Sequence, residues 1–339
     1  MALTMDAPSI QAVTTSDGLS IAYAVVGEGI PIILLPFHHN HVLLRWEGPP
    51  MFRGLAEHFR ILHYDSRGQG LSTRGRSVHP TAADYRRDLE AVIKASGFER
   101  FALVAYGGFG HVGMRYAVDN PERVIGLTLI CTCESFVSWP RAAFHDLAAE
   151  NWDLFLELQT RGLPRDFARR AIADANQTDY LRMIRCFMDS DVSDVMGKVV
   201  VPTLFVHSLD QHWLAPSEGA KLAAKIENAR IVFIDGDVEP DENKAVPEIV
   251  RFLKGVHSPE VIGPMPSGQV TSTSDLSARQ LEVLKLISEG KRTREIAEAL
   301  VLSERTVERH IADVYTKIGA RNRAEATAYL LSRPELVPS

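Results

Sequence analysis

Six short apolar runs, each rich in Val, Ile or Leu, alternate with helix-length amphipathic segments through most of the chain. The runs cover residues 30–36, 59–65, 101–106, 124–132, 201–208 and 229–235. Strands that are apolar on both faces and separated by helices are typical of a parallel sheet covered by helices on both sides. The preceding apolar segment, 19–27, is expected to pair antiparallel at the sheet edge. The sequence therefore predicts a doubly wound α/β domain.

A segment rich in Gly, Pro, Ser and Thr interrupts this pattern at residues 255–274. It has no sustained apolar periodicity, which is typical of a linker between domains. The length of 339 residues fits one large domain and a smaller one. We therefore expect an α/β domain at 1–254, a linker at 255–274 and a second domain at 275–339.

Within the first domain the strand pattern stops at about residues 134–198, where the sequence becomes helical and aromatic residues are scattered, among them Trp139 and Trp152. Such an insertion is more often packing than a ligand site. Placed over the carboxyl ends of parallel strands, however, it would cap the crevice where α/β proteins bind ligands. We expect a helical cap here.

Composition excludes several classes of protein. The chain is 45% hydrophobic and 24% charged, as in ordinary globular proteins, and its longest apolar stretch is far shorter than the roughly 20 residues of a membrane helix. The N-terminus lacks the features of a secretory signal. Three cysteines complete neither a disulfide framework nor a zinc site. We expect a cytoplasmic protein without a metal or other cofactor and without membrane contact.

Charge is distributed unevenly. The net charge is −6, but residues 275–339 carry +1 against −7 for the rest, and residues 291–323 hold eight basic side chains and five acidic ones. Mixed charge on helices is usually a solvated face. A local basic surplus is also what contact with nucleic-acid phosphates requires.

The second domain is predicted to consist of short helices with sharp starts. Ser277, with Gln280 three residues later, predicts a capping box, and Gly290 closes the first helix. A second helix is expected to open at Thr293 and a third, capped by Ser303, is amphipathic and basic. A fourth follows. Two short helices joined by a tight turn describe a helix-turn-helix.

The motif DSRGQGLS at residues 65–72 resembles the turn D-x-R-G-x-G-x-S that follows a central strand in α/β-hydrolases. The resemblance implies that the later strand, FALVAY, leads into the turn that carries the G-x-S-x-G nucleophile in that fold. Here the turn reads AYGGFG, with Gly107 at the expected serine position. Glycine has no side-chain oxygen that can attack a carbonyl.

The same resemblance places Glu239 where the catalytic histidine is expected. The acid is ambiguous, because Asp210 lies one residue early and Gln211 occupies the usual spacing. Triad residues act as a unit, so the loss of nucleophile and base leaves only binding and residual electrostatics. The resemblance thus implies a catalytically disabled hydrolase-like domain.

A pocket that survives without a nucleophile suits a small, apolar or aromatic molecule. The histidine cluster after Phe37 shows no converging carboxylate at a telling spacing, so ligand contact or loop packing is favoured over metal binding. The candidate ligand-binding residues are Phe37, His38, His39, Tyr106, Gly107, Gly108, Trp139, Trp152, Asp210 and Glu239.

Downstream of the linker, the sequence from LSARQLEVL to KIGARNR resembles the helix-turn-helix of LuxR-type transcription regulators nearly along its length. The resemblance implies that the helix over residues 303–318 enters the major groove of DNA. Glu308 stands where many members place Lys. His310 is expected to support the domain internally, while Val307 and neighbouring apolar residues pack its core. The candidate DNA-binding residues are Thr293, Arg305, Thr306, Glu308, Arg309, Lys317, Arg321 and Arg323.

The combination predicts a ligand-responsive transcription regulator that binds a small-molecule effector and, as a homodimer, a DNA operator with two half-sites. One alternative is an enzyme fused to a DNA-binding domain, using Ser66 or Cys131 as nucleophile or Glu239 for proton transfer. Another is a protein-interaction scaffold, which predicts a filled crevice.

Overall fold

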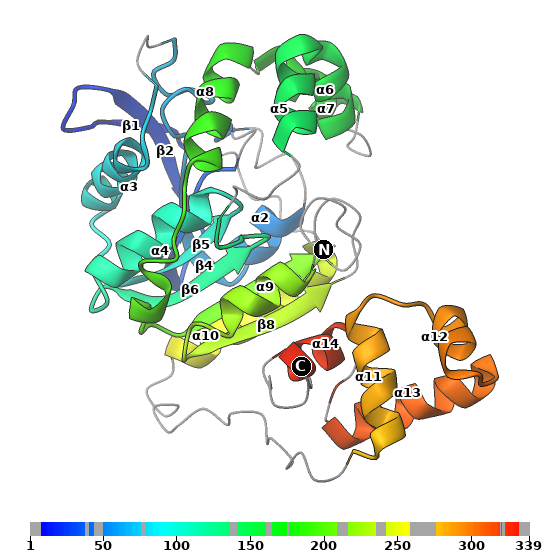
Figure 1. Cartoon of the computed structure of the whole chain (residues 1–339). Helices are drawn as coiled ribbons and strands as arrows, with labels where there is room; N and C mark the ends of the chain where they lie inside the picture. Colours follow the sequence, from blue (N-terminus) through cyan, green and yellow to red (C-terminus); the bar gives the residue numbers. More distant parts are fainter. Residues whose placement is uncertain are drawn as a thin grey trace.

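A computed structural model gives the arrangement of both parts of the chain (Figure 1). The structure describes residues 8–37, 41–43, 50–75, 79–135, 141–160, 165–174, 176–208, 216–234, 242–257, 276–318, 320 and 323–331.

Eight strands form one sheet in the order β1-β2-β4-β3-β5-β6-β7-β8. All pairs from β4 to β8 across the sheet are parallel. The fold is therefore the expected doubly wound α/β sheet. Its strands are β1 (Gln11–Thr14), β2 (Ser20–Val26), β3 (Ile30–Leu34), β4 (Phe59–Tyr64), β5 (Phe101–Tyr106), β6 (Val124–Ile130), β7 (Thr203–Ser208) and β8 (Ala229–Ile234).

The antiparallel edge differs in one respect from the sequence-based expectation. β2 pairs antiparallel with β4, as expected, but it also pairs antiparallel with β1, which is the true edge strand. β1 has four residues, none of them fully buried, so it lacks the apolar run by which the other strands were recognised.

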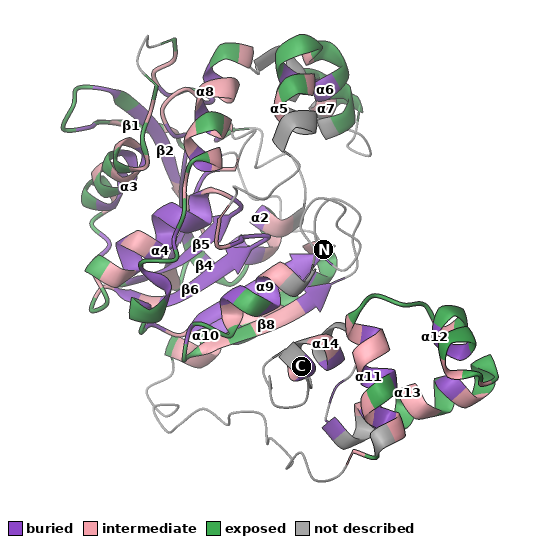
Figure 2. Ribbon diagram, in the orientation of Figure 1, coloured by how far each residue is buried: buried purple, intermediate pink, exposed green. Residues whose placement is uncertain are grey.

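Helices cover both faces of the sheet, and successive residues of a strand enter different apolar clusters. In β5, Leu103 packs with α3 and α4, whereas Val104 packs with α2 and α10. The central strands β5 and β7 are consequently buried along their whole length (Figure 2). This explains their continuous apolar sequences. The covering helices are α2 (Pro50–Ala56), α3 (Ala82–Ser96), α4 (Phe109–Asp119), α9 (Pro216–Ala223) and α10 (Glu242–His257).

Between β6 and β7 the chain forms the expected helical insertion, which lies to one side of the sheet (Figure 1). A small apolar cluster around Phe155 and Leu156 holds its helices together. Its elements are α5 (Arg141–Glu150), α6 (Trp152–Gln159), α7 (Arg165–Asp174), α8 (Gln177–Met188) and the 3-10 turn η2 (Met196–Lys198).

The C-terminal helices have a core of their own, formed by Val283, Ile296, Val307 and Val314 among others. The fourth helix also lies against α9 and β8 of the first domain (Figure 1). The helices are α11 (Ala278–Ser288), α12 (Thr293–Leu300), α13 (Glu304–Ile318) and α14 (Arg323–Leu331).

The boundaries proposed for the two domains and the linker stay predictions. Helix α10 continues to His257 and so includes the first three residues of the linker expected at 255–274. Residues 258–275, which make up most of that linker, lie outside the described part of the chain.

Candidate functional site

The turn between β5 and α4 is built around Gly107, whose φ of +50° lies in the left-handed region. The Gly107 N–H donates to the carbonyl of Ile130 at 2.9 Å, and the hydroxyl of Thr132 donates to the Gly107 carbonyl at 3.2 Å. Glycine adopts this conformation without steric penalty. A Cβ added at Gly107 would meet no described atom within 4 Å. The described residues therefore leave space directly beside the tip of this turn.

Gly108, also a predicted ligand-binding residue, differs because its side-chain space is already filled. A Cβ at Gly108 would lie 2.3 Å from Cγ of Phe187, on α8 of the cap. The Phe187 ring also stacks on Tyr85 and meets Phe109 edge to face, with centroids 5.2 and 4.8 Å apart. The glycine at 108 thus admits an aromatic ring from the cap.

Phe37 and Tyr106, two of the predicted ligand-binding residues, lie together at the carboxyl edge of the sheet. Parallel pairing of β3 with β5 brings their strand ends side by side, and their rings meet nearly perpendicular with centroids 4.1 Å apart. Nε2 of Gln69 donates to the Phe37 carbonyl at 2.6 Å. Phe37 and the buried Tyr106 therefore pack against each other beside Gly107 at the strand ends.

The D-x-R-G-x-G-x-S turn at residues 65–72 is stabilised by hydrogen bonds between its own residues. Oδ2 of Asp65 accepts from the Leu71 N–H at 2.9 Å, and the Ser72 hydroxyl donates to the Asp65 carbonyl at 2.6 Å. A Cβ at Gly70 would lie 2.0 Å from Oδ2 of Asp65, and φ at Gly70 is +45°, so glycine is required there. The motif's glycine and serine shape the loop that holds Phe37.

Arg67 of the same motif fixes helix α3 to this loop. Its Nη2 lies 2.7 Å from Oδ1 of Asp88, a carboxylate with no exposed side-chain area. Burial raises the pKa of Asp88 to about 6 although Arg67 opposes the shift. At the exposed end of the guanidinium, hydrogen bonding to Arg67 lowers the pKa of Asp17 to about 2.

In the cap, Trp152 packs inside the insertion's own apolar cluster. Its ring stacks on Phe155 with centroids 5.3 Å apart and lies 5.5 Å from the ring of Tyr180. These contacts assign Trp152 a packing role within the cap. The other predicted ligand-binding residues, His38, His39, Trp139, Asp210 and Glu239, lie outside the described residues.

Two buried histidines near the strand ends were not singled out from the sequence. His111 on α4 contacts the carbonyl of Cys133 through Nε2 and the hydroxyl of Ser190 through Nδ1, both at 2.8 Å. A carbonyl only accepts, so Nε2 carries the proton. Burial lowers the pKa of His111 to about 4, which keeps the ring neutral. The neutral ring ties α4 to the ends of the cap.

His207, near the end of β7, is fully buried, and neither ring nitrogen forms a hydrogen bond that meets normal geometry with the described residues. Burial lowers the pKa of His207 to about 4, against a smaller opposing effect of the Thr132 backbone. A Cβ at Gly219 would lie 2.5 Å from Nε2, so α9 packs directly on the ring. A histidine inside an apolar strand gives no sequence signal of this packing.

In the C-terminal domain the predicted helix starts are confirmed. The Ser277 hydroxyl accepts from the Gln280 N–H at 3.2 Å while the Gln280 side chain accepts from the Ser277 N–H at 3.0 Å. Helix α12 begins at Thr293. The Ser303 hydroxyl accepts from the Thr306 N–H at 3.2 Å and so caps α13. The two helices meet through Val301, a β-branched residue at φ +53°.

Helix α13 has one buried face and one exposed face. Val307, Val314 and Ile318 face the core, as expected. Arg305, Glu308 and Arg309 are exposed, and their side chains make no hydrogen bond or ion pair within the described part of the chain. These three side chains are available to a partner.

The remaining predicted DNA-binding residues are less exposed or engaged. Thr293 is half-buried, and the Thr306 hydroxyl lies 2.8 Å from that of Ser303. Arg323 donates to the carbonyl of Lys291, which joins the start of α14 to the turn before α12. The side chain of Lys317 and the whole of Arg321 lie outside the described residues.

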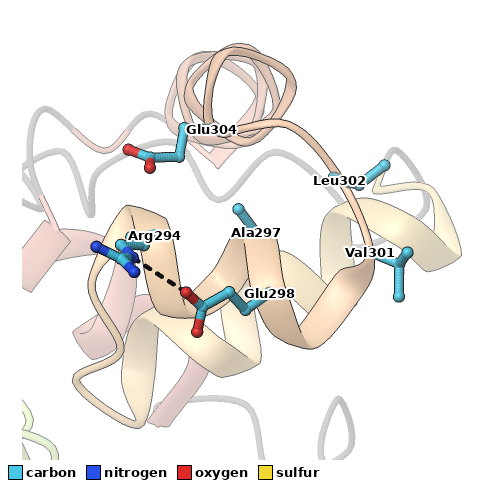
Figure 3. A pocket seen from close by; sticks show the side chains of 6 residues that line it. All are labelled: Arg294, Ala297, Glu298, Val301, Leu302 and Glu304. Atoms are coloured by element: carbon cyan, nitrogen blue, oxygen red, sulfur yellow. Dashed lines mark hydrogen bonds and ion pairs between the residues drawn. The ribbon is translucent and has the colours of Figure 1, made fainter.

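A hollow lies beside the turn that joins α12 and α13 (Figure 3). Nε of Arg294 is 3.0 Å from Oε1 of Glu298, and this pair is the dashed contact in the figure. A second carboxylate, Glu304, belongs to the same lining, so the hollow has more negative than positive charge. Phosphate is therefore disfavoured there. The lining residues are Arg294, Ala297, Glu298, Val301, Leu302 and Glu304.

The fold and its two sites define an α/β domain joined to a helix-turn-helix domain. Residues 274–330 match the family model of bacterial regulatory proteins of the luxR family, and residues 37–180 match the model of the α/β hydrolase fold. The chain thus carries a LuxR-type helix-turn-helix behind an α/β-hydrolase domain.

The relatives of the first domain are proteins with enzyme names. A putative carbamate hydrolase RutD of Klebsiella pneumoniae subsp. pneumoniae is 26% identical over 195 residues, covering 52% of this chain and 73% of the relative. A non-heme haloperoxidase of Rhodococcus erythropolis is 25% identical over 254 residues, covering 66% and 90%. The bromoperoxidase from Bacillus anthracis superposes with a TM-score of 0.63 at 18% identity, covering 73% of this chain and all of that one, which is a likeness of fold.

Within the described ranges, no helix is long and apolar enough to span a bilayer. The same residues contain no group of three or more His, Cys, Asp or Glu side chains arranged to hold a metal ion.

Proposed function

We propose that this protein is a ligand-responsive transcription regulator, in which a non-catalytic α/β-hydrolase domain binds a small molecule and the LuxR-type domain binds DNA. The observation that carries the proposal is Gly107. It lies at the tip of the strand-to-helix turn, has a left-handed φ and has no side chain. In α/β-hydrolases this turn holds the nucleophile, so the usual attack on a carbonyl has no attacking atom here.

Neither of the other nucleophiles considered from the sequence is presented to a substrate. Ser66 and Cys131 are both fully buried. The Ser66 hydroxyl is also committed to Oε1 of Gln69 at 2.7 Å. A nucleophile needs both access and an activating base, and burial removes the first of these. This supports a binding role for the domain.

The effector of this proposal is a small apolar or aromatic molecule. The open space beside Gly107 and the Phe37–Tyr106 ring pair provide room and an apolar wall at the carboxyl ends of the strands, the usual place for ligands in α/β sheets. Gly108 contributes backbone only, because Phe187 fills its side-chain space. His38, His39, Trp139, Asp210 and Glu239 complete the proposed site, and Trp152 supports the cap from within. The proposed site contains no metal or other cofactor.

For DNA we propose that α13 enters the major groove with Arg305, Glu308 and Arg309 toward the bases. The remaining proposed DNA contacts are to the backbone and come from Thr293, Thr306, Lys317, Arg321 and Arg323. Two copies of the chain would bind two half-sites as a homodimer, because a two-fold protein matches a two-fold operator. A regulator of this kind works in the cytoplasm.

The test is an unbiased selection of genomic DNA fragments by the purified full-length protein, with and without extract from the source cells. Enrichment of a sequence with two half-sites supports a dimeric regulator, and a change on adding extract supports the effector. If neither condition enriches any fragment, the proposal fails.

A second candidate is an enzyme with an unusual active site, which the hydrolase and haloperoxidase names of the relatives favour. Its remaining route is proton transfer by Glu239. Hydrolysis of activated esters by the natural protein that disappears in Glu239→Gln would support this candidate. No turnover in either protein, together with DNA enrichment, would overturn it.

A further inference from the structure

The basic residues of the helix-turn-helix domain divide into engaged and unengaged side chains. Arg294 pairs with Glu298, and Arg323 bonds the Lys291 carbonyl. Arg305 and Arg309 are exposed and have no such partner among the described residues. An unengaged guanidinium can bind DNA without first breaking a contact. The two arginines of α13 are therefore the side chains best prepared for base contacts.

Glu308 is exposed on the same helix, and its side chain likewise has no hydrogen-bond or ion-pair partner among the described residues. A carboxylate only accepts hydrogen bonds and is repelled by phosphate, so a Glu in a DNA interface needs a base donor. The major groove offers two, the N4 amino group of cytosine and the N6 amino group of adenine. Adenine places the acceptor N7 beside its donor, which opposes a carboxylate. Cytosine has no acceptor there and is the better match.

Arg309, the next residue, carries hydrogen-bond donors and therefore suits a base that offers acceptors. The O6 and N7 atoms of guanine are adjacent acceptors that fit the two-pronged guanidinium. Arg305 precedes Arg309 by four residues, which at 1.5 Å per residue is about 6 Å along the helix. That distance is close to two base steps of 3.4 Å. The three side chains can therefore address neighbouring bases together.

We infer that α13 selects an operator half-site containing a C·G base pair, with Glu308 accepting from cytosine N4 and Arg309 donating to a nearby guanine. The inference rests on the proposed DNA-binding function and adds to it the base chemistry of the operator. Glu308 thereby acts as a specificity determinant. The Glu308 carboxylate gains no attraction to phosphate, so its contribution is to disfavour bases other than cytosine at this position.

The test is selection from randomised duplex DNA by the full-length protein, repeated with three variants. Wild-type protein is expected to enrich cytosine at one position of each half-site. Glu308→Ala should relax the preference there about tenfold while other positions keep theirs. Glu308→Gln should move the preference toward adenine, because an amide both donates to N7 and accepts from N6. Glu304→Gln, an exposed acid one turn earlier on the helix, is the matched control and should keep the wild-type sequence.

The outcomes distinguish an error in the role of Glu308 from an error in the DNA-binding function. If wild-type protein enriches a sequence but Glu308→Ala enriches the same one with equal strength, the role of Glu308 is wrong and DNA binding stands. The inference is also overturned if the Glu308-dependent position prefers a base other than cytosine. If wild-type protein enriches nothing, the DNA-binding function itself is wrong.

Discussion

Phe187 of the cap occupies the place where a side chain at Gly108 would stand, with its Cγ 2.3 Å from the position of an added Cβ. At Gly107, the residue before it, an added Cβ would meet none of the described atoms within 4 Å. Two adjacent glycines in one turn therefore serve different purposes. One admits the cap and the other leaves room beside the strand ends.

This contrast predicts different effects of the same substitution. Gly108→Ala should lower the free energy of unfolding by about 1–3 kcal/mol, because the Phe187 ring must move. Gly107→Ala meets no described atom and should lose only the roughly 1–2 kcal/mol of left-handed strain. Urea unfolding of the full-length protein measures both. A Gly108→Ala protein as stable as wild type would contradict the packing described for the cap.

The buried histidines predict loss of stability in mild acid. The pKa of His111 and that of His207 are each lowered from 6.5 to about 4 by burial. Between these values the unfolded chain binds more protons than the folded one, so the free energy of unfolding falls as pH decreases from about 6.5 toward 4. The loss approaches roughly 3 kcal/mol for each histidine. The raised pKa of Asp88 offsets part of this loss, because over the same range that carboxyl is protonated in the folded chain and ionised in the unfolded one. Urea midpoints measured across this pH range provide the check.

Substitution separates the two histidines. His207→Leu should reduce the pH dependence and be close to neutral at pH 7, because no well-formed hydrogen bond is lost among the described residues. His111→Leu should also reduce it, but at pH 7 it leaves the Ser190 hydroxyl and Cys133 carbonyl without this partner and costs about 1–3 kcal/mol. Unchanged pH dependence in both variants would show that other groups control acid stability.

Substitution of Arg309 is expected to change operator binding alone, whereas substitution of Arg323 is expected to change thermal stability as well. Arg309→Ala should weaken operator binding about tenfold and leave stability unchanged, because the side chain is exposed and makes no hydrogen bond or ion pair with a described residue. Arg323→Ala should also lower the thermal midpoint of the C-terminal domain, since it removes the bond to the Lys291 carbonyl. Fluorescence anisotropy with operator DNA and thermal unfolding, run in parallel, distinguish them. Equal melting of the two variants would argue against a supporting role for Arg323.

Val301 predicts a stabilising substitution. It is 91% exposed and holds a φ of +53°, a conformation that strains a β-branched side chain. Val301→Asn should raise local stability by about 1 kcal/mol, because Asn tolerates the left-handed region and no buried contact is lost. Hydrogen exchange of α12 and α13 in the full chain should slow. Faster exchange would mean that the Val301 side chain stabilises the turn in another way.

The elements that were predicted well from the sequence are either buried on both faces or stabilised by contacts between residues close together in the chain. β5 is buried on both faces, so its continuous apolar run identified it, and the Ser277–Gln280 capping box is complete within four residues. β1 was missed because it is short and exposed. Its pairing with β2 depends on register rather than on composition.

The candidate site was predictable where a backbone turn dictates the residue. Gly107 follows from the strand-to-helix turn, and the left-handed φ agrees with it. The packing of Phe187 on Gly108 was not predictable, because it joins segments far apart in the chain, and that of Gly219 on His207 was not, because it depends on how α9 lies against β7. Tertiary contacts of this kind leave no periodic signal in either segment. The same is true of the contact between Trp152 on α6 and Tyr180 on α8, which depends on how the cap helices pack together.

Helix α14 belongs to the core of the DNA-binding domain and also leans on α9 and β8. Residues 209–215 run directly into α9, and residues 235–241 continue directly from β8, so Asp210 and Glu239 lie in segments joined to the elements that α14 touches. The two domains are therefore in direct contact through α14 as well as joined by the peptide chain between them. A longer segment at residues 258–275 changes the length of the peptide connection between the domains, but it leaves the residues of α14, α9 and β8 that meet there unchanged.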